Sequence, residues 1–592
     1  MQGCYSGARK RFSTTISVLS LLAVLLMACS SGDKTTANPT PTPTDVQYVD
    51  YDLHIPSDGL NSPTIGPLPP DTKLHVIITF KANQDELKKL KALKDKADSG
   101  VDLKQEANKI GITDEQYAKI KQYLGVDGVS LSLDTLHTNL TVDAKASLLE
   151  RLLQTRFVQH KLKNGRVFYA PETAPKIPDF MKDRIVGING LDNYSQAPTG
   201  HASLQKASPL TSTSKQTAHA DNCFLDDRTL NNQQVAHAYG YDSFWKEGFS
   251  GKGMTVDLVE LESFDQSDAQ GYFDCVGYKG KFNVINVGQE PPAGKGIGES
   301  TLDIDMVAGL APYADINVYQ GVDEEGVGSW NVFNDILAKI ADDNAHSRKS
   351  SVVSISWGGA EANMTPEVYN AMSTNLQLLT DAEHMTVFAA SMDCGAFAEG
   401  EWNQLGVGYP SSDPYATAVG GTQLTVDGQG NRSSEVVWQD GSDKSKCENQ
   451  WGSGGGLSSE FDQPKYADTL GLKNSYSNGH RQVPDIAAVA YNLAVFYKGE
   501  WYNFMGTSAA TPIWAAGMAL LNQKLIVKHK MHVFSTDLFY EVAHTNQSKG
   551  HPFYDITKGN NLHYPATKGW DYATGLGTPN LTDFYATVEG LL

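Results

Sequence analysis

The chain has 592 residues, of which 68 are acidic and 48 are basic, so its formal net charge is −20. A chain well beyond about 250 residues is expected to hold more than one domain, and the 40% hydrophobic content is typical of a globular protein. The excess of negative charge argues against nucleic acid as the main partner, because a nucleic-acid site needs a positive surface.

The N-terminus has the pattern of an export signal. A basic stretch at residues 9–11 precedes an apolar run over residues 16–28. The run is shorter than the roughly 20 residues that span a bilayer, and it is typical of a signal peptide. It ends in Leu-Met-Ala-Cys, which resembles the cleavage motif of bacterial lipoproteins. This implies removal of residues 1–28 and a membrane anchor through lipid on Cys29. An ordinary cleaved signal is the alternative. In both cases we expect an extracytoplasmic bacterial protein, secreted or membrane-anchored.

Residues 29–45 form a Pro/Thr-rich spacer, which extends rather than folds. Residues 46–195 follow with alternating strand and helix patterns. Residues 74–82 predict a strand, and Asn83 with Glu86 predicts the start of a helix that places Leu87, Leu90 and Leu93 on one face. Thr113 with Gln116 predicts a second helix start, and Asn164-Gly165 predicts a hairpin. This order is typical of a ferredoxin-like α+β module.

The remainder of the chain predicts a linker and a second domain. Residues 196–222 are polar and of low complexity, which favours an exposed, cleavable linker. From residue 223 to residue 592, buried-strand runs alternate with helical stretches. Such alternation predicts an α/β fold with a doubly wound parallel sheet and helices on both faces. In these sheets the functional site lies at the carboxyl ends of the strands.

Four cysteines lie beyond the signal and lipid candidates: Cys223, Cys275, Cys394 and Cys447. An even number in an exported protein allows two disulfides. Sequence alone leaves the pairing open, and we favour Cys394–Cys447 with Cys223–Cys275. There is no Cys-x-x-Cys or His-Glu-x-x-His spacing that would indicate a zinc site.

The stretch Gly506-Thr507-Ser508 precedes an apolar helical pattern. Small residues let the backbone turn sharply and let a substrate carbonyl approach, as a nucleophilic serine requires. A serine also needs a base, and none of the 15 histidines lies in a His-Gly-Thr helix start. Glu299 and Asp303 are four residues apart, which places both carboxyl groups on one helix face. Such a pair is expected to share a proton in acid and to act as the base. Two solvated helix carboxylates are the alternative.

Several motifs together resemble the sedolisin family of serine-carboxyl peptidases, over roughly residues 225–585. They are GESTLDID, SISWGG, AASMDCGA, GSGGGLSSEF, RQVPDIAAVA and MGTSAATP. The N-terminal module is similar to the pro-kumamolisin type of activation prodomain, through GPLPPDTKLHVIITF and VFYAPETAPKIPDFM. The resemblance implies a subtilisin-like doubly wound parallel sheet, preceded by a prodomain that inhibits its own peptidase domain.

The resemblance also implies roles for individual residues. Ser508 would be the nucleophile and Glu299 the general base and later acid, while Asp303 would orient Glu299 and hold the shared proton. Asp393 would stabilise the oxyanion from its protonated form, which requires acid. Glu260 and Trp357 match positions that extend the hydrogen-bond chain in some relatives, with a strand-end carboxylate and a core aromatic as the alternative. The family usually has glycine where this chain has Met392.

The stretch YDITKGNNLHYPATKGWDYATGLGTP resembles the calcium loop of the family. The resemblance implies one structural Ca²⁺ ion. Its ligands would be the carboxylates of Asp555 and Asp571 and the backbone carbonyls of Ile556, Thr567 and Gly569. A mixed set of carboxylate and carbonyl oxygens suits calcium. A metal-free turn is the alternative.

We therefore expect a self-activating, acid-active serine-carboxyl endopeptidase that acts on proteins or peptides as a monomer, in the range of about pH 3 to 5. The sequence leaves open whether it acts as an endopeptidase or as a tripeptidyl-peptidase. Acid is expected to weaken contacts between the peptidase domain and prodomain lysines such as Lys88, Lys89 and Lys91. The first rival is an inactive surface-binding protein that keeps the fold, although none of the four implied catalytic residues is missing. The second is a nucleotide-binding protein, but GKGIGES lacks the P-loop ending.

Overall fold

The computed structural model describes residues 46–93, 101–195, 198–200, 203–205, 229–294, 296–324, 326–345, 350–397, 404–441, 447, 450–545 and 550–592. The signal peptide, Cys29, the spacer, Cys223 and most of the predicted linker lie outside these ranges, so the predictions for them stay predictions. Residues 48–592 form one compact unit, separate from residues 1–47. Among the described helices, none is both long enough and apolar enough to cross a membrane.

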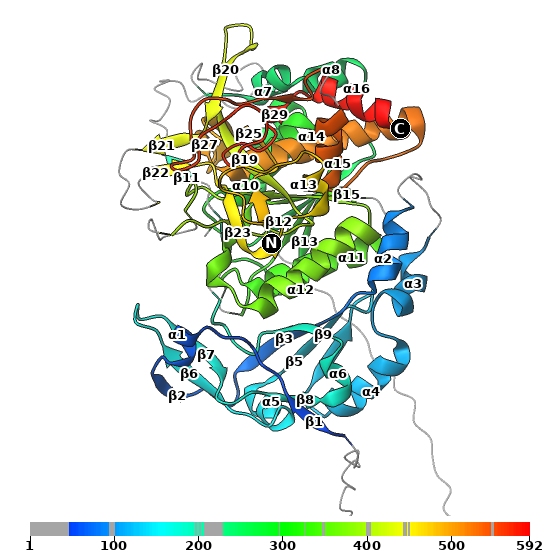
Figure 1. The fold of residues 1–592 in the computed structure, drawn as a ribbon, viewed down its shortest axis with the longest axis vertical. Helices are drawn as coiled ribbons and strands as arrows, with labels where there is room; N and C mark the ends of the chain where they lie inside the picture. Colours follow the sequence, from blue (N-terminus) through cyan, green and yellow to red (C-terminus); the bar gives the residue numbers. More distant parts are fainter. Residues whose placement is uncertain are drawn as a thin grey trace, which may run out of the picture. The chain divides into compact units, whose positions relative to one another are not determined.

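The N-terminal module is built on a four-stranded antiparallel sheet with the order β4-β5-β3-β9. This is the strand order of a ferredoxin-like module, which confirms that prediction (Figure 1). The strands are β3 (Lys73–Phe80), β4 (Ser130–Leu133), β5 (Asn139–Lys145) and β9 (Ile185–Asn189). The helices are α2 (Gln84–Lys91), α3 (Leu103–Ile110) and α4 (Asp114–Leu124) between β3 and β4, and α5 (Ala146–Leu152) after β5.

The local signals in this module act as predicted, with one exception. The Asn83 side chain accepts the first backbone N–H groups of α2, and Thr113 forms a capping box with Gln116. Strands β6 (Phe157–Lys161) and β7 (Val167–Pro171) form the predicted hairpin, and Gly165 supplies the positive φ of its turn. The exception is Leu93, which is exposed because α2 ends at Lys91.

The second domain is built on an eight-stranded sheet with the order β13-β14-β12-β15-β17-β19-β20, with β25 beside β19. All neighbours are parallel except the pair β19 and β20. The strands are β12 (Thr255–Glu260), β13 (Phe282–Asn286), β14 (Asp315–Gln320), β15 (Ser350–Ile355), β17 (Thr386–Ala390), β19 (Thr417–Val426), β20 (Arg432–Val437) and β25 (Ile486–Val489).

Alternate residues of the central strands enter two different hydrophobic cores. Val256 and Leu258 pack with helices α10 (Glu299–Leu310) and α14 (Thr507–His529), whereas Val259 packs with α11 (Trp330–Ala345) and α12 (Pro366–Gln377). Because successive strand residues point to opposite faces, helices must cover both faces of the sheet. The predicted doubly wound fold is confirmed.

The carboxyl ends of the strands carry the polar motifs. Strand β12 ends at Glu260, β15 ends one residue before Ser356, and β17 ends shortly before Asp393. Helices α10 and α14 pack against each other, and both begin near this edge. Residues far apart in the sequence therefore meet at the position that Figure 1 shows beside α10 and β12.

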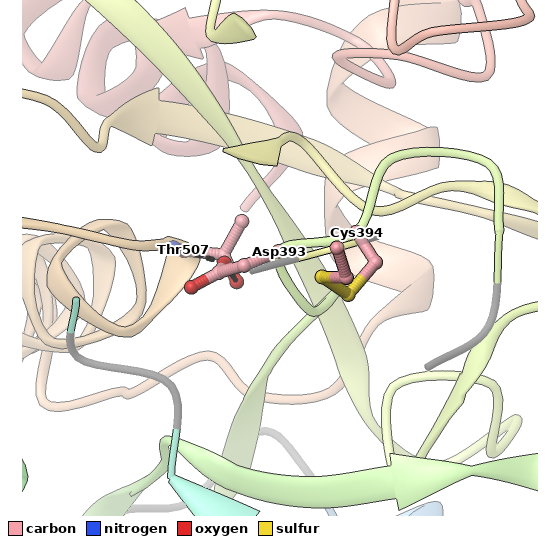
Figure 2. Close-up of a disulfide and its surroundings, with 4 residues drawn as sticks. Asp393, Cys394 and Thr507 are labelled. Carbon is pink, nitrogen blue, oxygen red and sulfur yellow. Dashed lines mark hydrogen bonds between the residues drawn. A yellow bond between two sulfur atoms is a disulfide. The ribbon is translucent and has the colours of Figure 1, made fainter. Parts of the chain in front are cut away.

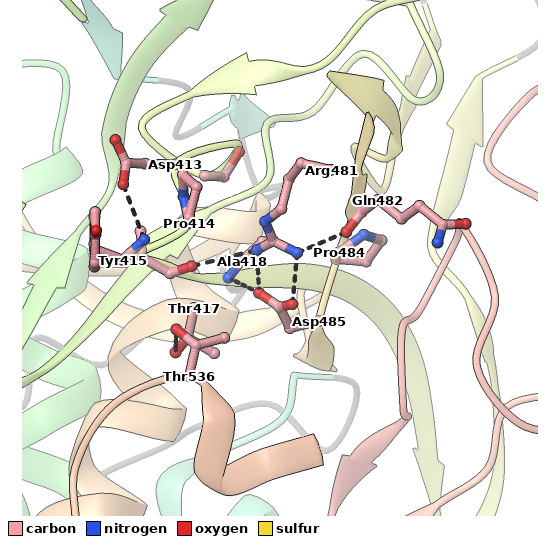
Figure 3. Close-up of polar contacts among 12 residues, drawn as sticks. Asp413, Pro414, Tyr415, Thr417, Ala418, Arg481, Gln482, Pro484, Asp485 and Thr536 are labelled. Carbon is pink, nitrogen blue, oxygen red and sulfur yellow. Dashed lines mark hydrogen bonds and ion pairs between the residues drawn. The ribbon is translucent and has the colours of Figure 1, made fainter. Parts of the chain in front are cut away.

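A fully buried ion pair holds the end of the sheet where β19 and β25 meet. Arg481 donates from Nη1 and Nη2 to Asp485 Oδ1 and Oδ2 at 2.8 and 2.6 Å, and neither side chain is exposed. Asp485 also accepts the backbone N–H of Ala418 at 2.6 Å (Figure 3) and the hydroxyl of Tyr540 at 2.6 Å. One carboxylate thus fixes β19, the start of β25 and helix α15 (Asp537–Thr545).

Removing the guanidinium should destabilise the fold strongly. Arg481→Met leaves a buried carboxylate without its cation, which costs on the order of 3–5 kcal/mol. The measurement is the free energy of unfolding of the full chain from urea denaturation. The matched control is Lys246→Met, because Lys246 pairs with Asp242 at 2.8 Å while its side chain is 71% exposed. That change should cost less than about 1 kcal/mol. Equal losses in the two variants would contradict the argument.

Candidate active site

Ser508 is the second residue of α14 and is almost completely buried, with 1% of its surface exposed. The helix follows Gly506, whose φ of +146° is available to glycine and allows the sharp entry that the sequence predicts. Among the described residues, no hydrogen-bond partner lies within reach of Ser508 Oγ. The expected contact between Ser508 and a base is thus not formed in this structure. Catalytic hydrogen bonds commonly tighten only with substrate bound.

Glu299 and Asp303 lie in the first turns of α10, and both side chains are fully buried. The structure confirms that they share one helix. The N-cap is Gly298, which has no side chain to cap the helix, and the Glu262 carboxylate accepts the N–H groups of Gly298 and Ser300 instead. Glu262 was not singled out from the sequence, because it caps the helix from another segment of the chain.

Glu260 and Trp357 extend this group of carboxyl side chains. Trp357 Nε1 donates to Glu260 Oε2 at 3.0 Å, and the Ser300 hydroxyl donates to the same oxygen at 2.8 Å. Asp303 lies close to Glu260 and Ser356, and both affect its pKa. The contact that was expected between Glu260 and Trp357 is therefore present. The contributions of Ser300 and Ser356 were missed, since isolated serines give no pattern in a sequence.

Burial governs the protonation of these carboxyl groups. Loss of water raises the pKa of Glu260 to about 8, although the hydrogen bonds from Trp357 and Ser300 lower it. Burial also raises the pKa of Asp303 well above its usual range, and the nearby charges of Glu260 and Glu299 raise it further. None of the described ion pairs offers these groups a cation. The cluster therefore holds protons that exposed carboxyl groups would have lost.

Asp393 meets the beginning of α14 from the end of β17. Its Oδ1 accepts the backbone N–H of Thr507 at 2.8 Å and the Thr507 hydroxyl at 2.7 Å (Figure 2). The side chain is fully buried. The structure thus places Asp393 in contact with the residue directly before Ser508, which is where an oxyanion partner is needed. Thr507 was not assigned a role from the sequence.

A disulfide joins Cys394 to Cys447, with the Cα atoms 5.2 Å apart, and it follows Asp393 directly (Figure 2). This confirms one of the two favoured pairings. The other pairing includes Cys223, which lies outside the described residues.

Part of the predicted linker lies along strands that border this site. Strand β10 (Thr199–Gly200) pairs antiparallel with β16 (Trp357–Ala360), so that Thr199 is opposite Gly358 and Gly200 is opposite Trp357. Strand β11 (Ser203–Gln205) pairs with β27 (Glu500–Met505), which ends just before Ser508. The two pairings place one segment of the chain on both sides of the candidate nucleophile.

Two families match the chain in tandem. The family described as "Pro-kumamolisin, activation domain" matches residues 61–194, and the subtilase family matches residues 291–533. Kumamolisin of Bacillus sp. (strain MN-32) is 33% identical over 368 residues, which cover 58% of this chain and 61% of kumamolisin. Sedolisin of Pseudomonas sp. (strain 101) is 24% identical over 473 residues, which cover 76% of this chain and 75% of sedolisin. The chain is a homologue of kumamolisin and sedolisin.

A solved structure supports the same fold for this sedolisin homologue. The structure is Pseudomonas sedolisin, a serine-carboxyl proteinase complexed with two molecules of pseudo-iodotyrostatin. It superposes with a TM-score of 0.54 at 23% identity and covers 61% of this chain and 98% of its own. The superposition establishes the subtilisin-like fold of the peptidase domain.

The prodomain of this sedolisin homologue contacts its peptidase domain through carboxyl groups of α11, α12 and the turn after α12. His75 of β3 contacts Asp335 at 2.6 Å, and Lys91 of α2 pairs with Asp381 at 3.0 Å. His54 contacts Glu367 at 2.9 Å. Of the prodomain lysines named from the sequence, Lys91 makes the expected contact, whereas Lys89 pairs with Glu86 of its own helix.

The carboxyl groups at this contact titrate at a higher pH than exposed ones. Burial raises the pKa of Asp335 and of Asp381, although hydrogen bonds and ion pairs from the prodomain lower it. Burial likewise raises the pKa of Glu367 to about 7, against the hydrogen bond from His54. Burial thus favours the neutral form of these carboxyl groups, and a pKa raised in the bound state does not by itself weaken the contact in acid.

The predicted calcium ligands lie in one loop region, and their surroundings suit a cation. Asp571 is buried, and burial raises its pKa to about 6, although hydrogen bonds from the N–H groups of Thr567, Ala573 and Thr574 lower it. Among the described residues, no hydrogen bond is donated to the carbonyl oxygens of Ile556, Thr567 or Gly569. Asp555 accepts the N–H of Gly569 at 3.1 Å, which holds the early and late residues of the predicted ligand set close together. No cluster of three or more His, Cys, Asp or Glu side chains is found in the part of the chain that the structure describes.

The raised pKa of the buried Glu260 predicts that the free energy of unfolding depends on pH. Glu260 has a folded-state pKa near 8 and an ordinary value of 4.5, so between these values the native state binds more protons than the unfolded state. The free energy of unfolding should therefore fall as pH rises through this window. Glu260→Gln keeps the size and removes the titration. We expect its melting temperature to rise relative to wild type by a few degrees more at pH 7.5 than at pH 4.

The matched control for this prediction is Glu115→Gln, because Glu115 has an 80% exposed side chain. That variant should show no pH-dependent difference from wild type. The argument would be overturned by a Glu260→Gln variant whose melting temperature follows wild type in parallel at every pH.

Proposed function

We propose that this protein is a serine-carboxyl endopeptidase that cleaves proteins or peptides in acid and is made as a self-activating precursor. The observation that carries the proposal is the buried group of carboxyl side chains at the start of α10, packed beside the buried Ser508 at the start of α14. Among the described residues no histidine is hydrogen-bonded to Ser508 Oγ, so the serine needs another base, and a carboxylate in a protonated network can supply one.

In the proposed reaction Ser508 Oγ attacks the carbonyl carbon of the scissile bond and passes its proton to the Glu299 carboxylate. Asp303 keeps its own proton, because burial raises its pKa, and so holds Glu299 as the ionised member of the pair. Collapse of the tetrahedral intermediate breaks the C–N bond, and Glu299 returns the proton to the leaving amine. Water then hydrolyses the ester on Ser508 with Glu299 again as base, and the serine is restored.

The negative oxygen of the tetrahedral intermediate would be stabilised by Asp393. Because Asp393 Oδ1 is held by two donors from Thr507, the proton of the neutral acid would lie on Oδ2 and could be donated to the oxyanion. An ionised Asp393 would repel the oxyanion instead. This requirement is the reason for proposing activity in acid, with a maximum of kcat/KM between about pH 3 and 5.

The position of the linker beside Ser508 suggests where the precursor would be cut during maturation. Strands β10 and β11 bracket Ser508 as a bound substrate would, so the bond to be cut is expected between Gly200 and Ser203. Processing in acid would depend on protonation of Asp393 and of the Glu299/Asp303 pair, because the raised pKa values of Asp335, Asp381 and Glu367 do not by themselves predict release of the prodomain. Export, lipid attachment at Cys29 and a monomeric state complete the proposal and rest on the sequence alone.

A binding protein that keeps this fold without activity remains the rival function. Such a binding protein would account for the prodomain and for the linker strands β10 and β11 beside the site. It gives no reason for the chain to keep Ser508, Glu299, Asp303 and Asp393 together, with three carboxyl groups that are costly to bury. Failure of the purified wild type to process itself or to hydrolyse an unfolded protein at any pH would favour the rival.

Self-processing gives the direct test. Purified precursor brought from pH 7.5 to pH 4 should shorten at a bond between residues 200 and 203, read by intact mass and N-terminal mapping. Ser508→Ala should stay full length, because it lacks the nucleophile but keeps the fold. The matched control is Ser267→Ala, whose hydroxyl is on the surface and bonds only to nearby Asp265, and it should process as wild type does. Processing of pure Ser508→Ala at the wild-type rate would exclude Ser508 as nucleophile.

We also propose that the loop around Asp555 and Asp571 binds one Ca²⁺ ion. An ion that binds only the native state stabilises it by RT ln(1 + [L]/Kd), about 2.7 kcal/mol at 100 times Kd. Wild type should therefore melt several degrees higher in calcium than in chelator. Asp571→Asn keeps an oxygen for the N–H groups of Ala573 and Thr574 but loses the charge. Its melting temperature should be the same with and without calcium. An equal calcium effect in both proteins would reject the site.

A further inference from the structure

Met392 is a large residue in a backbone conformation that favours glycine. Its φ is +77°, within the left-handed region where a side chain is strained, and only 6% of its surface is exposed. It lies directly before Asp393. A chain that accepts backbone strain next to a reactive group commonly does so because the side chain is needed there.

The Met392 side chain packs onto the bare backbone of two glycines. A Cβ atom on Gly408 would lie 2.2 Å from Met392 Cγ, and one on Gly358 would lie 3.0 Å from Met392 Sδ. Gly408 belongs to β18 (Gly408–Tyr409), which pairs with β16, so the two glycines lie in neighbouring strands of one small sheet. The thioether therefore covers one face of the β16–β18 pair, and the glycines leave space for it.

The same face is the one along which a substrate would lie. Thr199 is opposite Gly358 in the antiparallel pair of β10 and β16, and residues opposite each other have side chains on the same face. By the two-residue repeat of a strand, a substrate residue two positions beyond the one opposite Gly358 would share that face and lie opposite Ser356, whose hydroxyl donates to the backbone carbonyl of Ser508 at 3.3 Å. We take that substrate residue, called P1, as the one whose carbonyl Ser508 would attack.

We propose that Met392 sets the primary specificity of this enzyme by filling part of the P1 pocket. The inference rests on the proposed peptidase function and adds to it the size of the side chain accepted at P1. With the thioether lying over Gly358 and Gly408, the pocket takes small and medium side chains and excludes the double ring of tryptophan. Met392 touches the substrate side chain and no reacting atom, so it acts on selection and not on the chemical step.

The test compares two peptides that differ only at P1, one with alanine and one with tryptophan, mixed and cleaved by the acid-processed enzyme. Wild type should favour alanine. Met392→Gly removes the thioether and also suits the positive φ, so the fold should be kept. The ratio of kcat/KM for tryptophan over alanine should rise about tenfold or more, because a few added or missing methylenes in a pocket change selection on that scale. Met392→Leu keeps the bulk and should stay near the wild-type ratio.

The matched control is Met385→Ala, which removes a fully buried methionine just before the opposite end of β17. It should lower the melting temperature and leave the ratio unchanged. An unchanged ratio in a folded, active Met392→Gly would overturn the inference while the proposed function stood. A change seen only in peptides varied two residues before P1 would place Met392 in another subsite and would overturn it as well. Absence of cleavage of every peptide by wild type would instead reject the proposed function.

Discussion

Glu260, Glu299 and Asp303 are buried side by side, and the cost of holding charge there decides how the rest of the site can work. A carboxylate out of water is costly unless a cation or several donors compensate it, and Glu260 accepts hydrogen bonds from Trp357 and Ser300. The state of lowest free energy is one in which the three carboxyl groups share protons. Such a site has the protonation states needed for catalysis in acid rather than at neutral pH.

The same physical effect recurs at the contact between the prodomain and the peptidase domain. Asp335, Asp381 and Glu367 lie at this contact and are removed from water, and burial raises the pKa of each. His75 works in the opposite sense: although burial lowers its pKa, hydrogen bonds to Asp143 and Asp335 raise it to about 10, so it stays charged throughout the acid range. Burial thus places carboxyl groups with raised pKa values both in the catalytic cluster and at the prodomain contact.

Small residues around the candidate active site let segments of backbone come close together. Gly506 allows the chain to turn into α14, and Gly358 and Gly408 let the sheet around β16 come close to Met392. The buried pair of Arg481 and Asp485 fixes the strands on the far side of this region, through contacts to Ala418 and Tyr540.

The sequence by itself determined the elements whose signals are local. The capping residues Asn83 and Thr113, the Asn164-Gly165 turn and the alternation of buried strands with helices act within a few residues, so they could be interpreted without a structure. Ser508, Glu299, Asp303 and Asp393 were found because their motifs are specific, and Leu93 was misplaced because a helix end is set by more than its apolar spacing.

Only the tertiary structure decided which of these residues meet. Glu262 caps α10 from another segment, Thr507 holds Asp393, Trp357 binds Glu260, and the linker strands lie on both sides of Ser508. Each contact joins residues separated by long stretches of sequence, and no periodic pattern in the sequence predicts such pairs. The protonation of the carboxyl groups also depends on the tertiary structure. The pKa of a carboxyl group depends on how far folding excludes water from it, and a sequence does not show whether that group is exposed or buried.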